Sequence, residues 1–200
     1  MSMEYGGYTT SDVRGMESPM RKLYLVFATF VLLTLCIGCT GPMTGKIVDA
    51  ETGQPIEGAI VLVEWTKVHG FGNSYTSSEK AVEVFSGKDG VVHLPGYNDP
   101  TVKSPDVTVY KPGFVAWNNK WIFPDYNKRT NFEWKDGYVF RLEKIKSESG
   151  FSYDLHTSFI RGIVGTGLIE RKDNIKKAIN WEEEIAFKER QTKRVNGNGK

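Results

Sequence analysis

The sequence predicts a mainly β fold, an antiparallel β-sandwich followed by a C-terminal helical tail. Across residues 43–145 the apolar runs are short, rich in β-branched and aromatic residues, and separated by turn-forming residues. Pairs such as Asp89-Gly90 and Asp136-Gly137 favour hairpins, because a type I′ turn needs positive φ at both central positions. Beyond residue 146 the pattern changes, and residues 173–194 carry apolar side chains at helical spacing.

Composition limits the classes of protein to which the chain can belong. Its 200 residues suffice for one domain of ordinary size plus extensions, and the hydrophobic fraction of 40% is typical of a globular chain. The 26 basic and 24 acidic residues nearly balance, so we expect no nucleic-acid partner, which would need a concentrated basic face. Both cysteines, Cys36 and Cys39, precede the predicted sandwich, which therefore has neither a disulfide nor a cysteine metal site.

The N-terminal part of the chain has the pattern of an export signal. Basic residues at 21 and 22 precede the uncharged run LYLVFATFVLLTLCIG, which ends in small residues, and we assign residues 20–38 to a signal peptide. The run is shorter than the roughly 20 residues that span a bilayer as a helix, so a membrane-spanning anchor is the weaker alternative. Residues 1–19 are expected to be either a disordered extension or the product of a mis-assigned start, with Met20 as the true first residue.

The end of this run, LCIGC, resembles a bacterial lipobox. Gly38 and Ile37 fit the positions before the modified cysteine, whereas Cys36 stands where leucine is usual. The resemblance implies that Cys39 is lipidated and becomes the mature N-terminus, with acyl chains that hold the protein on a membrane. The following Thr40 is not the aspartate associated with inner-membrane retention. We therefore expect a lipid-anchored protein of the bacterial cell envelope, in the outer rather than the inner membrane, with residues 39–42 as a short tether.

The stretch GKIVDAETGQPIEGAIVLVEW predicts two strands, residues 46–49 and 59–65, on either side of a polar turn. Strand alternation directs Ala59, Val61, Val63 and Trp65 to one face, as a core-facing set. Ile60 and Leu62 then point the other way, and we expect Val48 on a neighbouring strand to join them. A sheet face open to water would carry polar residues there, so another segment should cover this second apolar strip.

The same residues resemble a known family. GKIVDAETGQPIEGAIVLV, GKDGVVHLPG, VTVYKPGF and the closing GYVFRLE are similar, in this order, to the carboxypeptidase regulatory-like domain. The resemblance covers residues 43–146 and implies a seven-stranded antiparallel sandwich of the transthyretin-like or Ig-like type. It implies no catalytic residues, because this domain has none of its own and the chain is too short to hold the zinc peptidase domain.

A related resemblance is to collagen-binding B-type repeats, which share the pattern D-x-x-T-G-x-P-I-x-G-A. Those repeats often carry an internal Lys–Asn isopeptide bond, with the lysine two residues before the aspartate. Ile47 occupies that position here, and the last predicted strand has no Asn or Asp near its end. We therefore expect no isopeptide crosslink.

Residues 147–200 are expected to form a helical C-terminal extension. Its apolar positions recur at helical spacing, and Asp173 or Asn174 could cap the helix; the positions are Ile175, Ala178, Ile179, Ile185 and Ala186. One hypothesis is that this helix, or the preceding segment SFIRGIVG, packs on the outer face of the sheet. The alternative is that the helix docks on a partner.

Candidate catalytic and metal sites are not apparent in the sequence. His69, His93 and His156 form no metal-binding spacing, and we expect them to be exposed or lightly hydrogen-bonded. No nucleophile elbow G-x-S-x-G occurs. The segment GIVGTG, residues 162–167, lacks the lysine and hydroxyl residue of a phosphate loop, which favours a hinge or tight packing. We predict no catalytic residue, no metal and no cofactor.

Aromatic residues around 110–134 offer one candidate ligand site. Exposed rings stack on sugar faces, but most aromatic rings fill cores and cross-strand pairs. The candidates are Trp117, Trp121, Tyr126 and Trp134, of which Trp117 and Trp121 flank a polar NNK segment and are expected to be exposed first. The favoured interpretation is a non-enzymatic cell-envelope lipoprotein that presents its sandwich as a structural or protein-interaction module. Its partners would be the membrane and an envelope protein or glycan. The alternatives are a carbohydrate-binding module and, with no residues to support it, an enzyme.

Overall fold

The computed structural model describes residues 39–70, 72–99, 101–102, 105–146, 150–164 and 173–197. All of them belong to one compact unit, Gly38–Lys200. The predicted extension at residues 1–19 and the predicted signal peptide at residues 20–38 lie outside the described residues.

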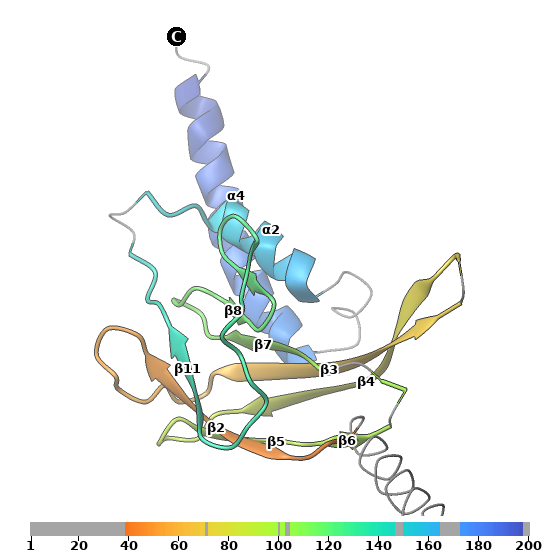
Figure 1. Cartoon of the computed structure of the whole chain (residues 1–200). Coiled ribbons are helices and arrows are strands. Elements are labelled where there is room, and N and C mark those ends of the chain that lie inside the picture. Colours follow the sequence, from red (N-terminus) through yellow and green to blue (C-terminus); the bar gives the residue numbers. More distant parts are fainter. Residues whose placement is uncertain are drawn as a thin grey trace, which may run out of the picture. The chain divides into compact units, whose positions relative to one another are not determined.

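The fold is a mainly β sandwich of two principal sheets with a pair of C-terminal helices, as predicted (Figure 1). The four-stranded sheet is antiparallel, in the order β4 (Tyr75–Phe85), β3 (Ile60–His69), β7 (Asp106–Tyr110) and β8 (Trp117–Asn118). The three-stranded sheet has the order β11 (Tyr138–Leu142), β2 (Met43–Asp49) and β5 (Val91–Leu94).

The predicted strand count and pairing need two corrections. Among the described residues, the two principal sheets together hold seven strands, and four two-residue strands form two further small sheets. These are β1 (Cys39–Thr40) with β6 (Tyr97–Asn98), and β9 (Trp121–Ile122) with β10 (Asn127–Lys128). The sandwich is also not wholly antiparallel, because β11 runs parallel to β2. The chain between β2 and β11, which includes the whole four-stranded sheet, provides the crossover that a parallel pair requires.

The main core lies between the two sheets and follows the predicted alternation of β3. Ala59, Val61, Val63 and Trp65 are completely buried in it. From the opposite sheet they meet a set of buried apolar side chains on β2, β5 and β11, namely Met43, Ile47, Val92, Leu94, Phe140 and Leu142.

Val48 does not join Ile60 and Leu62, so this part of the prediction is wrong. Val48 lies on β2, which belongs to the other sheet, and forms an isolated bridge with Pro55. The error arose because β2 and β3 are consecutive in the sequence but, in a sandwich, consecutive strands can belong to different sheets.

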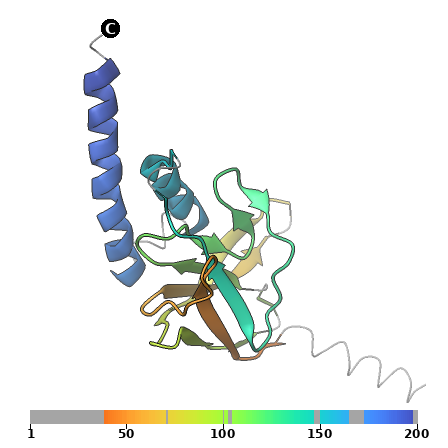
Figure 2. The same cartoon turned by 90° about the vertical axis from the view of Figure 1, so that its left-hand side faces the viewer.

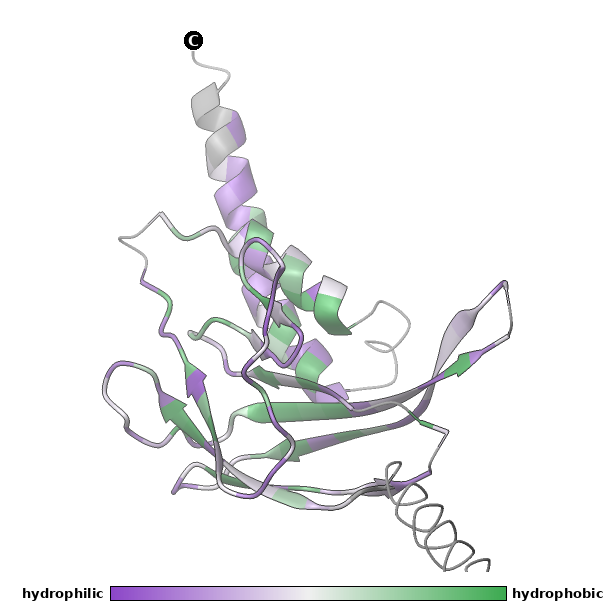
Figure 3. Cartoon of the chain, viewed as in Figure 1, coloured by the Kyte–Doolittle hydropathy of each residue, from purple (hydrophilic) through white to green (hydrophobic). Residues whose placement is uncertain are grey.

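A second core covers the outer face of β3 and β7, as the apolar strip predicted. Ile60, Leu62 and Tyr110 face two helices, α2 (Tyr153–Val164) and α4 (Asp173–Gly197). The helices contribute buried apolar residues, namely Phe159, Ile160, Val164, Ile175 and Ile179. Figure 2 shows both helices beside the sandwich, and Figure 3 shows apolar residues on β3 and on the part of α4 nearest the strands. The hypothesis that the tail packs on the sheet is confirmed.

The N-terminus of α4 is capped from the sheet rather than by its own first residues. The Glu83 carboxylate on β4 accepts hydrogen bonds from the backbone amides of Asn174 (3.3 Å) and Ile175 (2.9 Å) and from the Asn174 side-chain amide (3.0 Å). A carboxylate at this end satisfies free amides and is favoured by the helix dipole. The predicted cap by Asp173 or Asn174 missed this contact because Glu83 is remote in sequence.

Gly162 allows helix α2 to pack closely against the turn between β9 and β10. A β-carbon at this position would lie 2.6 Å from the Tyr126 hydroxyl oxygen, so any other residue would displace that ring. For Gly162, the predicted tight packing is confirmed; Gly165 and Gly167 lie outside the described residues.

Replacing Ile179 tests the second core. Ile179→Ala should lower the free energy of unfolding by about 2–5 kcal/mol, because it leaves a cavity beneath a side chain that is 1% exposed. On the same helix, Phe187→Ala should change it by less than about 0.5 kcal/mol, since that ring is 55% exposed. Urea denaturation followed by circular dichroism measures both; equal effects would contradict the packing of α4 on the sheet.

Candidate functional site

A cluster of three polar side chains lies inside the second core. Tyr110 on β7, His156 on α2 and Glu182 on α4 each have 0% of their surface exposed. The expectation that His156 is exposed or lightly bonded is therefore wrong. Its position three and four residues before Phe159 and Ile160 places it on the buried face of α2, and this spacing is the sequence feature that could have revealed it.

Glu182 holds the cluster together by accepting two hydrogen bonds, one on each carboxylate oxygen. The Tyr110 hydroxyl donates to Oε2, and His156 Nδ1 donates to Oε1. The other ring nitrogen of His156, Nε2, accepts a hydrogen bond from the backbone amide of Ala116 at 2.8 Å. A nitrogen that accepts an N–H carries no proton, so the imidazole is neutral and its proton is on Nδ1. The buried carboxylate thus has two donors and no cationic partner among these groups.

The environment of Tyr110 keeps its hydroxyl protonated. Burial raises the pKa of Tyr110 most strongly, followed by the negative charge of Glu182 and the hydrogen bond to that carboxylate. Each of these effects penalises a phenolate more than a phenol. Tyr110 is therefore a permanent hydrogen-bond donor to Glu182 at physiological pH.

The cluster has the composition of an acid–base site but not its geometry. A catalytic histidine needs one ring nitrogen within reach of a substrate, while a carboxylate orients the other. Here the backbone of Ala116 occupies Nε2, and solvent reaches none of the three side chains. What the arrangement does is join three elements: the sheet through Tyr110, α2 through His156 and α4 through Glu182.

Around the cluster, ion pairs connect the exposed sides of the two helices. Arg161 pairs with Glu183, and Arg190 pairs with Asp154, in both cases across the α2–α4 contact. These side chains are a third to a half exposed, where such pairs contribute at most about 1 kcal/mol each. The buried cluster, rather than these pairs, fixes the helices to the sandwich.

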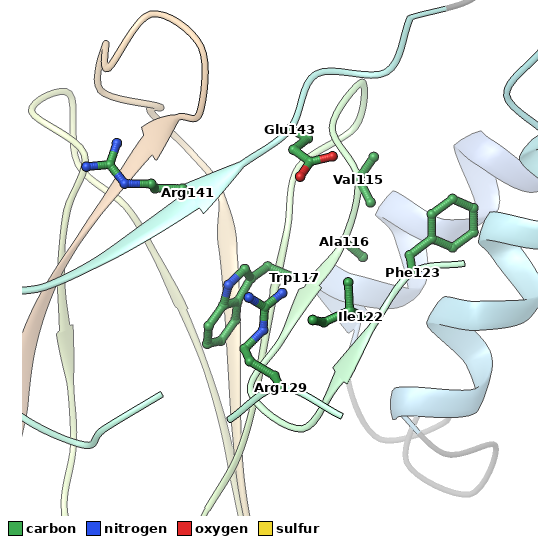
Figure 4. A pocket seen from close by; sticks show the side chains of 8 residues that line it. All are labelled: Val115, Ala116, Trp117, Ile122, Phe123, Arg129, Arg141 and Glu143. Atoms are coloured by element: carbon green, nitrogen blue, oxygen red, sulfur yellow. The ribbon is translucent and has the colours of Figure 1, made fainter. Parts of the chain in front are cut away.

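A small surface hollow lies beside the second core (Figure 4). Its volume of about 40 Å³ has room for roughly one water molecule. Arg129 lies over the Trp117 ring at 4.7 Å from its centroid and donates from Nε to the Asn118 carbonyl at 2.8 Å. Partial burial lowers the pKa of the Arg129 guanidinium. Figure 4 shows the Arg141 side chain turned away from the other labelled residues.

A larger groove of about 550 Å³ adjoins this hollow and shares Val115, Phe123 and Glu143 with it. One wall is apolar, and the ion pair between Lys146 and Glu51 lies at its charged side. The described residues that line it include no histidine, thiol or hydroxyl that could serve as a base or nucleophile. The groove is large enough for a small ligand and offers it an apolar wall and the charged side chains of Glu51, Glu143, Lys144 and Lys146.

Two of the four candidate sugar-binding rings belong to the main core. Trp117 is 5% exposed and packs edge-on against Phe140 with ring centroids 5.0 Å apart. Trp134 is partly buried against the same core, and its Nε1 donates to the Gly41 carbonyl at 2.8 Å. The prediction that Trp117 is among the first of these rings to be exposed is wrong, because β8 belongs to the four-stranded sheet and directs the ring inward.

The other two rings lie against the second core. Trp121 is partly buried against it, and Tyr126, 43% exposed, packs on Phe159 at 5.0 Å between centroids. A sugar-binding platform needs rings on one accessible surface. The structure instead divides the four rings between two cores.

The remaining histidines lie at the surface. His93 is exposed, as predicted, and its Nδ1 lies 3.3 Å from Thr44 Oγ1. His69 Nε2 lies 2.7 Å from Ser77 Oγ, but the Ser77 hydroxyl donates to Glu79 at 2.6 Å, which lowers the pKa of that carboxyl. A nucleophilic serine would donate its proton to the histidine, so this trio is not a catalytic set. No group of three potential metal ligands occurs among the described residues.

Cys39, the predicted lipidation site, lies at the start of the described structure. It forms the two-residue strand β1 with Thr40, paired with Asn98 and Tyr97 of β6. Residues 39–40 are therefore hydrogen-bonded to the sandwich and not a free tether. In the described part of the chain, every helix is too short or too polar to cross a membrane.

Comparisons with known proteins show weak likenesses to bacterial pilins. The chain matches no family model and no curated protein. Among solved structures it is similar to the pilus 2b backbone protein of group B streptococcus (17% identity, TM-score 0.31), a streptococcal ancillary pilin (19%, 0.28) and a mutant of the shaft pilin spaA from Lactobacillus rhamnosus GG (17%, 0.29). These matches cover 56%, 52% and 54% of this chain but 43%, 29% and 47% of those chains, less than half of each. At these TM-scores the likenesses carry no functional conclusion.

Removing the Glu182 carboxylate tests the importance of the buried cluster. Glu182→Ala should lower the free energy of unfolding by about 2–6 kcal/mol, because two buried donors lose their acceptor at about 1–3 kcal/mol each. The adjacent Glu183→Ala, which breaks a partly exposed ion pair with Arg161, should cost at most about 1 kcal/mol. Chemical denaturation compares the two variants. A Glu183 variant as unstable as the Glu182 variant would contradict the assignment.

The raised pKa of Tyr110 predicts a loss of stability at alkaline pH. The unfolded chain releases this proton near pH 10, whereas the folded chain retains it, so stability is complete below pH 10 and falls above it. Between pH 10 and 11 the wild type should lose about 1 kcal/mol more than Tyr110→Phe, which lacks the titrating group. Urea denaturation at each pH measures the difference; identical slopes for the two proteins would refute the prediction.

Proposed function

We propose that the chain is a non-catalytic, lipid-anchored module of the bacterial cell envelope. The observation that carries the non-catalytic part of this proposal is the sealed Tyr110–His156–Glu182 cluster. The three titratable groups of this cluster are fully buried and engaged with one another and with the Ala116 backbone, so they hold the helices on the sandwich. A protein that uses its acid–base groups in this way is suited to a structural or binding role.

The proposed anchor is Cys39, on the strength of the lipobox-like LCIGC and the apolar run before it. Thr40 after the cysteine favours the outer membrane over the inner membrane. In this proposal residues 20–38 are removed, and residues 43–146 are a sandwich of the carboxypeptidase regulatory-like type. The four main motifs of that resemblance fall on β2 and β3, β5, β7 and β11, in this order.

The proposed partners are the membrane and another envelope component that contacts the sandwich as a surface. A protein partner is favoured over a glycan, because the four candidate aromatic rings are divided between two cores, and of the second pair, Trp121 and Tyr126, Trp121 is partly buried.

Fatty-acid labelling in bacterial cells tests the anchor. The native chain should incorporate an alkyne-tagged palmitate, and Cys39→Ser should incorporate none, because the thiol that receives the diacylglycerol is lost. The matched control is Cys36→Ser, which removes the other cysteine and should leave labelling intact.

Mass spectrometry of the purified native protein should in addition show that residues 1–38 are gone and that Cys39 carries the lipid. A native chain that remains unlabelled and keeps its signal segment would refute the lipid anchor and favour a membrane-spanning one.

A further inference from the structure

One end of the sandwich combines the proposed attachment point with a projecting hairpin. The ring of Tyr97 on β6 lies 5.7 Å from Trp65 of β3, and Lys80 of β4 lies over the same ring. These contacts place β6 beside Trp65 and Lys80. From these two residues toward the turn that joins the two strands, β3 and β4 continue as a paired extension, residues 66–69 with residues 75–78, which we call the arm (Figure 1).

The arm departs from the sandwich at a structural irregularity. The pairing of β3 with β4 changes register between Trp65 and Thr66, as a β-bulge does. β7 pairs with β3 only from Ile60 to Glu64, so the four residues 66–69 extend past the sheet by about 13 Å.

Cys39 is fixed at this same end. Its backbone pairs with Asn98 and that of Thr40 with Tyr97, while the Gly41 carbonyl is held by Trp134 Nε1. A lipid attached to the Cys39 thiol would therefore begin directly at the sandwich surface, with no flexible spacer between the acyl chains and β6.

We infer that the β1–β6 end of the sandwich rests directly on the phospholipid headgroups, and that the arm makes a second contact with them. This inference rests on the proposed lipid anchor at Cys39. With the first contact fixed at β1, an arm that projects at the same end cannot remain far from the bilayer, because no tether separates the domain from its anchor.

The exposed side chains of the arm suit an interfacial environment. Tyr75 is 65% exposed and Val68 is 39% exposed. Tyrosine is enriched where a membrane meets water, because its ring prefers the apolar side and its hydroxyl the wet side. Tyr75 stacks on His69, with ring centroids 4.9 Å apart and planes 13° apart, so its ring is presented in a defined orientation.

The charges near the arm favour this aromatic contact over an electrostatic one. The Glu79 carboxylate is held by the Ser77 hydroxyl and lies 3.5 Å from His69 Nε2. Lys67 lies near both Glu79 and Asp99, and its charge helps to lower the pKa of each carboxyl, so charges of both signs are present in this region. A balanced surface neither attracts nor repels anionic lipids strongly, so the contact should persist at high salt.

Site-specific fluorescence in proteoliposomes tests the inference. If Cys36 is removed with the signal and the Cys39 thiol carries lipid, Tyr75→Cys creates the one free thiol of the mature chain for a fluorophore. The lipidated protein is reconstituted into vesicles of phosphatidylethanolamine and phosphatidylglycerol that contain headgroup spin-labelled lipid. We expect quenching at position 75 to exceed that of the control by at least threefold.

The control is Lys88→Cys, an exposed position in the turn after β4, at the end of that strand opposite the arm. Val68→Cys gives a second position, on the opposite face of the arm from Tyr75, and should also be quenched more than the control. Equal quenching at positions 75 and 88, or none at 75 and 68, would overturn the inference. Mass spectrometry of the same samples reports the lipid on Cys39, so a failure of the anchor is distinguished from a failure of the arm contact.

Discussion

Strand β3 carries apolar side chains on both of its faces, and this constraint organises the rest of the structure. Each large aliphatic side chain left in water would cost about 1.5–3 kcal/mol, so both faces must be covered. The opposite sheet covers Ala59, Val61, Val63 and Trp65, and α2 and α4 cover Ile60 and Leu62. The C-terminal helices are thus a third layer of the same folded unit, and the sandwich is incomplete without them.

The polar cluster determines how this third layer is oriented. Apolar contacts alone would tolerate several rotations of α2 and α4 against the sheet. A rotated packing, however, would leave the Glu182 carboxylate buried without the donors on Tyr110 and His156. Burying an unpaired carboxylate costs far more free energy than a small change in apolar packing. The cap that Glu83 supplies to the first amides of α4 fixes the helix along its axis in the same way.

The sequence predicted the features that depend on local periodicity. The alternation of residues 59–65 defined both faces of β3, and the spacing of Ile175 and Ile179 defined the packed face of α4. Contacts between remote segments could not be obtained in this way. His156 and Glu182 each lie on a buried helix face, but only the packing of three elements shows that they meet. Likewise, Trp117 has polar neighbours in the sequence, and its place in the core follows from the position of β8 in the sheet.

The parallel pairing of β2 with β11 has a consequence for the order of assembly. Gly45 lies opposite Tyr138, so the first long strand of the sandwich gains one of its two neighbours only when nearly all of the sandwich sequence is available. Pairings of such long sequence separation form slowly, because the intervening chain must be ordered first. The three-stranded sheet can therefore close only after residues 138–142 have been synthesised, whatever the rest of the sandwich has already formed.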